Sequence, residues 1–270
     1  MHLLILGCGT LGELVAERLL IQGHRVTGIR RTAAAAPPGV TMRWGDAADP
    51  HLHDGIERVD AVLLAANPGI RRGRDNGLAA MATLAIQRHP AARLIYTGTT
   101  SVYGDAEGRA VAEDGPLDPG PEAQALLAIE QAVLAHPQSL VLRATALVGP
   151  SRVFARERLR AAASGTGTAG TLTIKGDPDR PFSFVHEYDL AEVCAYAVSH
   201  GLGSGVVRLL NVAAPEMMTV RDYYGQLASG LGVTVAVLGD STAVPRRAIS
   251  ARKLYTLLPG HAWRGVLATE

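Results

Sequence analysis

Apolar side chains follow two alternating patterns along the first half of the chain. Short apolar runs, several of them apolar on both faces, predict strands at residues 2–6, 24–30, 40–44, 60–66, 92–98 and 139–149. Apolar residues at helical spacing predict helices over residues 10–22, 75–89 and 122–136. Strands that alternate with helices predict βαβ units, and therefore a doubly wound parallel α/β sheet.

The pattern changes after residue 150. Helical spacing predicts helices over 153–165, 187–201 and 219–232, and an apolar run predicts a strand over 206–212. A stretch rich in Gly, Asp and Pro, residues 168–186, lies among these elements. We therefore expect one large domain over residues 1–150, to which later segments can add strands, and a small mixed α/β lobe over residues 151–270.

Composition narrows the function classes. The 270 residues are nearly half apolar and carry a formal net charge of +1, so nothing indicates a nucleic-acid partner. The two cysteines, Cys8 and Cys194, are far apart and form neither a metal-ligand spacing nor a disulfide framework, which favours a reducing cytoplasm and no metal. The N-terminal apolar run is too short for a signal or membrane segment. We expect a cytoplasmic monomer or homodimer without a membrane partner.

A glycine motif follows the first expected strand and opens the first helix. Gly7, Gly9 and Gly12 fit G-x-G-x-x-G, with Thr10 and Leu11 inside the same loop. The first glycine permits a tight turn, the second lets the backbone approach a pyrophosphate, and the third lets helix and strand pack closely. Free N–H groups and the helix dipole then favour an anion at the helix start. The motif predicts a Rossmann-type dinucleotide site.

The end of the second expected strand bears on the choice of cofactor. An NAD site usually carries an acid there, but this chain has Arg30 and Arg31. A guanidinium suits a phosphate by charge and paired hydrogen bonds, so we expect NADP, with Arg30 as the main ligand and NAD as a possible cofactor. The alternative is that one or both arginines are solvated surface charges.

Further landmarks make a family resemblance specific. They are "WGDAADP", "LLAANPG", "YTGTTSVYGD", "LVLRATALVGP", "FSFVHEYDLAEV" and "LLNVAAP". In order and spacing the series resembles the extended short-chain dehydrogenase/reductase superfamily, and most closely its atypical branch of NAD-dependent epimerase/dehydratase-like proteins. The resemblance covers nearly the whole chain. It implies a Rossmann domain followed by a small substrate lobe.

The resemblance also implies roles for individual residues. The acid after the third strand, Asp46, with Ala47 beside it, would hold the adenine, and Ala65 and Ala66 would flank the adenosine ribose. Thr99, four residues before Tyr103, would polarise the reacting oxygen; its alternative is a turn hydroxyl that bonds local backbone. We also assign to the cofactor Thr97 and Thr145, and to the substrate Thr100, His186 and Tyr188.

The catalytic Tyr-x-x-x-Lys pair of the superfamily is missing. None of the 7 tyrosines has a lysine four residues later, and the matching window places Glu122 at the tyrosine position and Leu126 at the lysine position. A carboxyl group in an apolar pocket can donate a proton near neutral pH, so Glu122 is one candidate. Its alternative is a helix-start carboxylate after Pro121, favoured by the dipole. Tyr103, His186 and Tyr188 are further candidate donors. The alternative for Tyr103 is packing, and a lone histidine such as His186 is more often structural.

Two functions remain open. The first is an NADP(H)-dependent oxidoreductase or epimerase/dehydratase-like enzyme that acts on a small carbonyl or imine substrate with a non-standard proton donor. The second is an NADP(H)-binding sensor or docking protein without redox turnover, which the missing pair favours. Retention of Thr99 and of the second lobe favours the enzyme.

Overall fold

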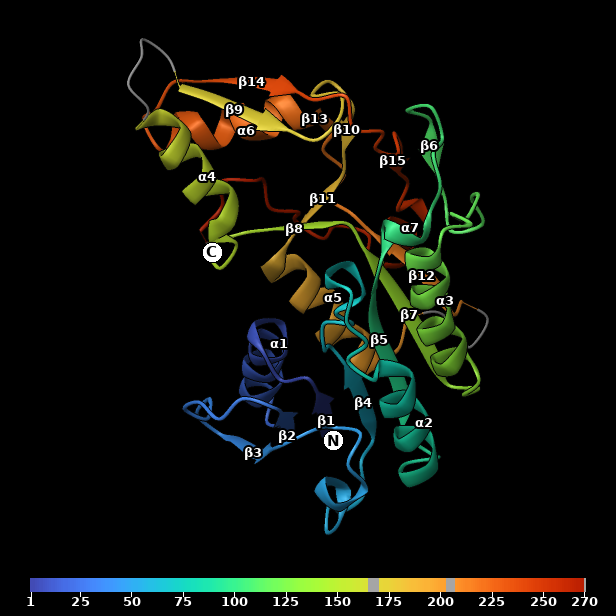
Figure 1. The fold of residues 1–270 in the computed structure, drawn as a ribbon. Helices are drawn as coiled ribbons and strands as arrows, with labels where there is room; N and C mark the ends of the chain where they lie inside the picture. Colours follow the sequence, from blue (N-terminus) through green and yellow to red (C-terminus); the bar gives the residue numbers. More distant parts are fainter. Residues whose placement is uncertain (165–169, 203–206, 270) are drawn as a thin grey trace. The chain divides into compact units, whose positions relative to one another are not determined.

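The computed structural model describes residues 1–164, 170–202 and 207–269. Its main feature is a seven-stranded sheet with the order β12-β7-β5-β4-β1-β2-β3 (Figure 1). The strands are β1 (His2–Leu6), β2 (Arg25–Arg30), β3 (Val40–Trp44), β4 (Ala61–Leu64), β5 (Arg93–Thr99), β7 (Ser139–Ala144) and β12 (Leu209–Val212). The expected parallel sheet is confirmed, since β1 pairs in parallel with β2 and β4, β2 with β3, and β4 with β5.

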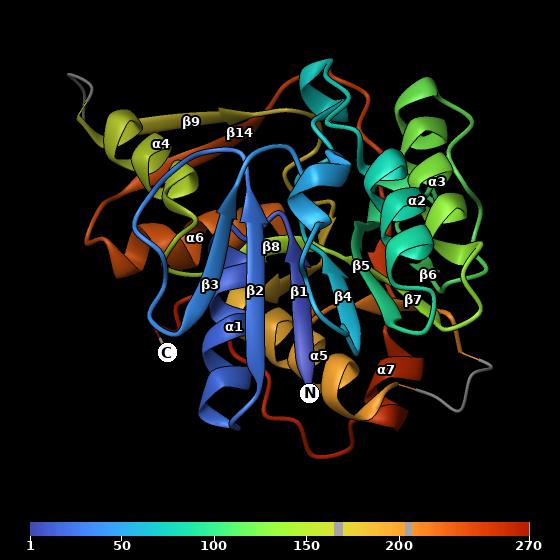
Figure 2. The same ribbon diagram turned by 90° about the horizontal axis from the view of Figure 1, so that it is seen from below.

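The direction of winding reverses at β1. The chain runs outward from β1 through β2 to β3, then crosses back to β4 on the other side of β1, so β1 and β4 are neighbours (Figure 2). Loops that leave the carboxyl ends of such a strand pair diverge and leave a crevice where ligands bind in open α/β sheets. We therefore expect a ligand-binding site at the residues that follow β1 and β4.

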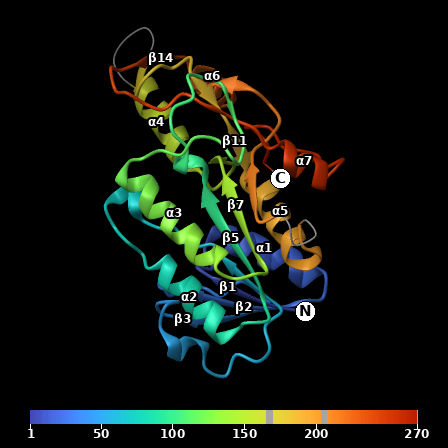
Figure 3. The same cartoon turned by 90° about the vertical axis from the view of Figure 1, so that its right-hand side faces the viewer.

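Helices cover both faces of this sheet (Figure 3). On one side lie α1 (Thr10–Ile21) and α5 (Glu187–His200), joined by an ion pair between Arg18 and Glu192 at 3.3 Å. On the other side lie α2 (Leu78–Arg88) and α3 (Pro121–Leu134), which pack against each other. Because both faces are covered, β1, β4 and β7 are buried along their whole length, as their continuous apolar runs predict.

The expected strand over 139–149 is wrong in one respect, because the chain forms two strands there. Both the backbone N–H and the hydroxyl of Thr145 donate to the carbonyl of Val212, at 3.1 Å. Beyond Thr145, β8 (Ala146–Val148) pairs in parallel with β11 (Phe184–His186) instead of continuing β7. The ends of two other expected elements, Gly165 and Val206, lie outside the described residues.

The chain divides into two compact units in an interleaved way. Unit 1 comprises residues 1–102, 119–143 and 188–210, and unit 2 comprises residues 103–118, 144–187 and 211–270. The sequence predicts a boundary at residue 150 with later segments adding strands to the first domain, whereas these two units exchange segments five times along the chain. Nearly all of α5 belongs to unit 1, and two contacts hold it there. An ion pair joins it to α1, and the side chain of Arg93 at the start of β5 donates to the carbonyl of Val198 at 2.8 Å.

Unit 2 has its own sheet and core. Strand β9 (Gly170–Ile174) pairs in parallel with β14 (Val235–Gly239), and α4 (Val153–Ala163) and α6 (Val220–Gly230) pack against them. The smaller elements are β6 (Ala110–Val111), β10 (Pro181–Phe182), β13 (Met218–Thr219), β15 (Ala248–Ile249) and α7 (Arg252–Leu257). Three strands thus lie within 168–186, where the sequence shows no periodicity, because strands of two to five residues broken by Gly and Pro are too short to show one.

None of the helices in the described part of the chain has both the length and the apolar character needed to cross a lipid bilayer.

Candidate functional site

The turn after β1 closes tightly against the ends of two neighbouring strands. Gly7 has φ +85°, and a Cβ atom there would lie 2.4 Å from the Cβ of Ala66, just past β4. The N–H groups of Gly7 and Cys8 both donate to the carbonyl of Ile29 in β2, at 2.9 and 3.0 Å. Only glycine tolerates both this backbone conformation and this contact. The turn therefore brings the ends of β1, β2 and β4 together at the switch point.

The other two glycines have opposite surroundings: Gly9 faces open space, whereas Gly12 is packed against β1. A Cβ at Gly9 would meet no atom within 4 Å, whereas a Cβ at Gly12 would lie 3.0 Å from Cγ2 of Ile5. Gly9 is the N-cap of α1 and no side chain caps the first turn, which begins with Thr10 and Leu11. Uncapped N–H groups at a helix start favour an anion, and the motif predicts a pyrophosphate there. The three glycines provide a tight turn, open space and close helix–strand packing in that order.

Cys8 lies within this turn but has no nucleophilic character. Its side chain is fully buried. Burial first, and the nearby charge of Glu13 second, raise the pKa of the Cys8 thiol to about 11. Because the thiolate is the reactive form, Cys8 remains an inert thiol at neutral pH.

Arg30 ends β2 and turns back toward the glycine turn. Its guanidinium forms an ion pair with Glu13 of α1 and donates to the carbonyl of Cys8 at 3.2 Å. The same group lies over the Trp44 ring at the end of β3, 5.2 Å from the ring centroid. The Arg30 side chain is 16% exposed, so it is held within the site and is not a solvated surface charge.

Arg31 extends in a different direction and connects two loops. Its Nη2 donates to the carboxylate of Asp46 at 2.9 Å and to the carbonyl of Asn76 at 2.8 Å, and its Nη1 donates to the Asn76 side chain at 3.1 Å. Asn76 is itself fixed, because its side chain donates to the carbonyl of Asn67 at 2.8 Å. Arg31 therefore links the ends of β2 and β3 with the loop after β4.

The residues expected around the adenosine lie along the same edge of unit 1. Asp46 is exposed and accepts from the N–H of Ala48 at 3.0 Å, while Ala47 is buried. Ala65 and Ala66 follow β4 directly and are partly buried. Thr97, in β5, donates its hydroxyl to the carbonyl of Leu64 at 3.3 Å. The expected cofactor residues of unit 1 thus lie in or just after the carboxyl ends of strands β1 to β5.

Thr99 is the last residue of β5 and forms a local hydroxyl pair. Its Oγ1 donates to the Ser101 hydroxyl at 3.1 Å and accepts from the Ser101 N–H at 3.1 Å. This is the local turn bonding considered as the alternative for Thr99, and the side chain is still partly exposed. Thr100, the next residue, is buried at the start of a short 3-10 helix, Thr100–Val102.

Glu122 lies in the first turn of α3 and is exposed to solvent. Pro121 occupies the first position of the helix, and Leu126 is buried on its inner face. This placement matches the helix-start alternative rather than a carboxyl group in an apolar pocket. Two turns further along, Glu130 forms a buried ion pair with Arg143 of β7, at 2.7 Å, which fixes α3 against the sheet.

Three of the expected site residues belong to unit 2, where their polar atoms have protein partners. Tyr103 is fully buried and donates its hydroxyl to Asn211 at 2.7 Å. The His186 side chain is also fully buried, with Nε2 3.1 Å from the carbonyl of Ala268. Thr145 donates to Val212, as described above. These contacts give all three a packing role within unit 2.

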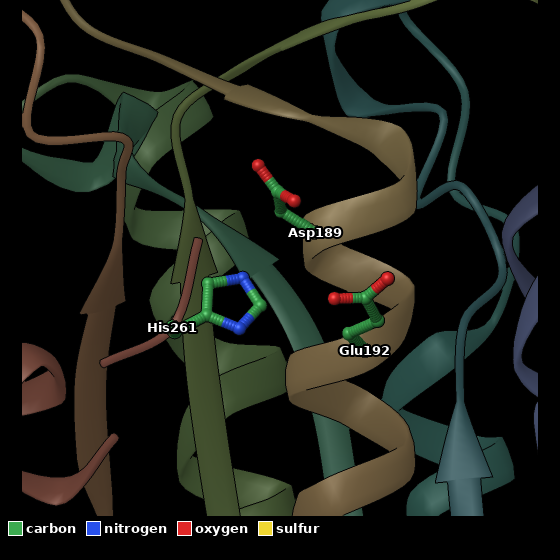
Figure 4. A group of neighbouring side chains, drawn as sticks. All are labelled: Asp189, Glu192 and His261. Atoms are coloured by element: carbon green, nitrogen blue, oxygen red, sulfur yellow. The ribbon is translucent and has the colours of Figure 1, made fainter. Parts of the chain in front are cut away.

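Tyr188 belongs to unit 1, near the start of α5. The Arg18 guanidinium of α1 lies over its ring, 5.7 Å from the centroid. Figure 4 shows Asp189 and Glu192 on neighbouring turns of the same helix; it also draws His261, which belongs to unit 2. Glu192 supplies the carboxylate that pairs with Arg18, so Tyr188 and Glu192 both hold α5 against α1.

Sequence reasoning missed four residues of this site: Glu13, Trp44, Asn76 and Ser101. Only Ser101 had a detectable signal, because a hydroxyl two residues after Thr99 matches a local turn. The other three act across 14 residues or more of sequence, a separation over which neither spacing nor composition indicates a contact.

A family model matches most of the chain. The model of the NAD-dependent epimerase/dehydratase family matches residues 3–213. A search of curated protein sequences found no match.

Solved structures share the fold across almost the whole chain. A putative NAD-dependent epimerase/dehydratase from Methylobacillus flagellatus is 24% identical, with a TM-score of 0.71, over 94% of this chain and 91% of that one. The dTDP-glucose 4,6-dehydratase of Bacillus anthracis in complex with NAD is 18% identical, with a TM-score of 0.75, over 96% and 90%. The Bordetella bronchiseptica enzyme WbmH in complex with NAD⁺ is 19% identical, with a TM-score of 0.76, over 98% and 94%.

Proposed function

The chain belongs to the NAD-dependent epimerase/dehydratase family, and from that premise we propose that it is an NADP(H)-dependent oxidoreductase or epimerase/dehydratase-like enzyme. Its substrate would be a small carbonyl or imine compound. A bound nicotinamide dinucleotide would supply or take up hydride, while the protein positions the substrate and stabilises developing charge.

One observation carries the preference for NADP(H). Two guanidinium groups, Arg30 and Arg31, follow β2 beside the open glycine turn, where a 2′-phosphate on the adenosine ribose would lie. Asp46 would hold the adenine and the start of α1 the pyrophosphate. NAD(H) remains a weaker second cofactor in this proposal.

For catalysis, the proposal assigns Thr99 as the donor to the oxygen that gains charge. Its hydroxyl lies at the carboxyl end of β5 and is paired with Ser101. Tyr103 receives a structural role, because its hydroxyl is buried against Asn211. Since the sequence has no Tyr-x-x-x-Lys pair and Glu122 is exposed, water or a substrate group would supply the proton. We expect little or no turnover of nucleotide sugars by the usual tyrosine-dependent route.

Fluorescence titration with NADPH and NADH tests the proposal. Wild-type protein should bind NADPH more tightly than NADH. Arg31→Ala should cost about 1.5–3 kcal/mol of NADPH binding, the worth of a charge-assisted hydrogen bond, and Arg30→Ala should weaken NADPH binding by less, because Arg30 is already paired with Glu13. Arg25→Ala is the matched control, because Arg25 lies at the opposite end of β2 in an exposed pair with Glu57. Absence of binding by either dinucleotide would exclude the proposed function.

A sensor or docking protein without turnover is the second candidate. The exposed position of Glu122 and the missing Tyr-x-x-x-Lys pair favour it. Oxidation of NADPH in the presence of a panel of aldehydes, ketones and imines separates the two. Binding of NADPH without turnover of any compound would favour the sensor.

A further inference from the structure

Arg30 does not present a free positive charge to a ligand. Its Nη1 is paired with the carboxylate of Glu13 and also donates to the carbonyl of Cys8 at 3.2 Å. The Trp44 ring covers one face of the guanidinium. The end of β2 therefore carries a closed cation–carboxylate pair, whereas the sequence alone indicates an available cation.

Glu13 reaches this position from the helix rather than from the strand. It is the residue after Gly12, in the first turn of α1, and its side chain is 38% exposed against 16% for Arg30. In NAD sites the acid that accepts from the ribose hydroxyls stands at the end of the second strand. Glu13 brings a carboxylate to the same end of β2 by another route, through its contact with Arg30.

We propose that Glu13 determines the choice between NADP(H) and NAD(H) at this site. The inference rests on the proposed dinucleotide function and concerns only its selectivity. A 2′-phosphate carries close to two negative charges at neutral pH, so it must compete with the Glu13 carboxylate for the Arg30 guanidinium. The uncharged ribose hydroxyls of NAD(H) do not compete for Arg30 and can donate to that carboxylate.

Arg31 provides the part of phosphate recognition that is independent of Glu13. Its partners are Asp46 and Asn76, and its side chain is 47% exposed. Arg31 is also paired with a carboxylate, but its side chain is far more exposed than that of Arg30, so a 2′-phosphate would bind mainly through Arg31 while Glu13 limits the contribution of Arg30. Removal of the Glu13 charge should widen the preference for NADP(H) rather than create it.

The test is Glu13→Gln, with Glu17→Gln as the matched control. Glu17 lies one turn further along α1 and is exposed. Glu17→Gln removes the same charge from the helix without touching Arg30. Glu13→Gln should tighten NADPH binding by about tenfold, the value of one charge-assisted hydrogen bond, and leave NADH binding unchanged or weaker. Glu17→Gln should alter both dissociation constants by less than twofold.

A double-mutant cycle tests whether the effect passes through Arg30. In an Arg30→Ala background, Glu13→Gln should change the ratio of the two dissociation constants by much less than in the wild type. Glu13→Ser serves as a second variant if Glu13→Gln lowers the melting temperature. An unchanged NADPH/NADH ratio in folded Glu13 variants, or a ratio change equal to that of Glu17→Gln, overturns the inference and leaves the proposed function intact. Wild-type protein that binds neither dinucleotide would instead exclude the proposed function itself.

Discussion

Substitution of Thr99 should lower the reaction rate without changing the affinity for NADPH. The Thr99 hydroxyl is placed to donate to an oxygen that gains charge, so it acts mainly in the transition state. Thr99→Val should lower kcat about a hundredfold, as loss of one such donor does elsewhere, with little change in NADPH affinity. Thr99→Ser, which keeps the hydroxyl, should retain most of the activity. Steady-state rates with a substrate from the carbonyl and imine panel, together with NADPH titrations, check this. Normal turnover by Thr99→Val would show that Thr99 acts only in its turn with Ser101.

Gly7 and Gly23 allow backbone strain to be separated from steric contact. Both have positive φ, +85° and +79°, but a Cβ at Gly7 would lie 2.4 Å from Ala66 while one at Gly23 would meet no atom within 4 Å. Gly23→Ala should cost only the left-handed strain, about 1–2 kcal/mol of unfolding free energy. Gly7→Ala should cost more and abolish dinucleotide binding, because the turn must open. Chemical denaturation and NADPH titration measure the two effects; equal losses of stability would contradict the close contact with Ala66.

At the scale of elements, a buried ion pair adds to the apolar packing that holds α3 on the sheet. Glu130 and Arg143 are each 4% exposed, and the Arg143 Nε and Nη2 atoms donate to the Glu130 carboxylate. Glu130→Gln removes the charge of one partner from a buried ion pair, and loss of one partner of such a pair typically costs about 3–5 kcal/mol. Urea denaturation measures the loss. Glu57→Gln, which removes an exposed partner of Arg25, is the control and should change stability little.

The sequence predicts most elements of the sheet because burial on both faces leaves continuous apolar runs. It also predicts the order of site residues in unit 1, since each one follows a strand and parallel strands end at one edge. The break at Thr145 is not predictable, because "LVLRATALVG" stays apolar through it and only the contact with Val212 redirects the chain. The pairing of Glu13 with Arg30 is likewise invisible, because it depends on how α1 lies beside β2.

At the scale of the molecule, two buried histidines and one partly buried histidine should make unit 1 sensitive to acid. Burial lowers the pKa values of His2, His53 and His89, that of His89 to about 4. Their folded pKa values lie below the unfolded value of about 6.5, so the unfolded chain binds more protons between pH 6.5 and 4. Stability is therefore full above pH 6.5 and falls as the pH drops toward 4.

The His89 contribution to this loss should be roughly 2 kcal/mol, less than its full shift because the ring is only partly buried. Thermal melting at pH 7 and at pH 5 measures the dependence, and His89→Gln should flatten it. His51→Gln is the control, because His51 is exposed on the surface. A melting temperature that stays constant from pH 7 to 5 would contradict the burial of these rings.

The interleaved division of the chain has a consequence for synthesis on the ribosome. The polypeptide passes from one unit to the other at residues 102–103, 118–119, 143–144, 187–188 and 210–211. The central sheet therefore lacks its edge strand β12 until Val212 has left the exit tunnel, and the α1 face of the sheet lacks α5 until His200 has done so. A nascent chain whose first 150 residues have left the exit tunnel would expose an apolar sheet face and an unpaired β7 edge, both of which promote aggregation. Nascent chains at that stage should bind holdase chaperones, and release into a folded state should follow only after the second half has been translated.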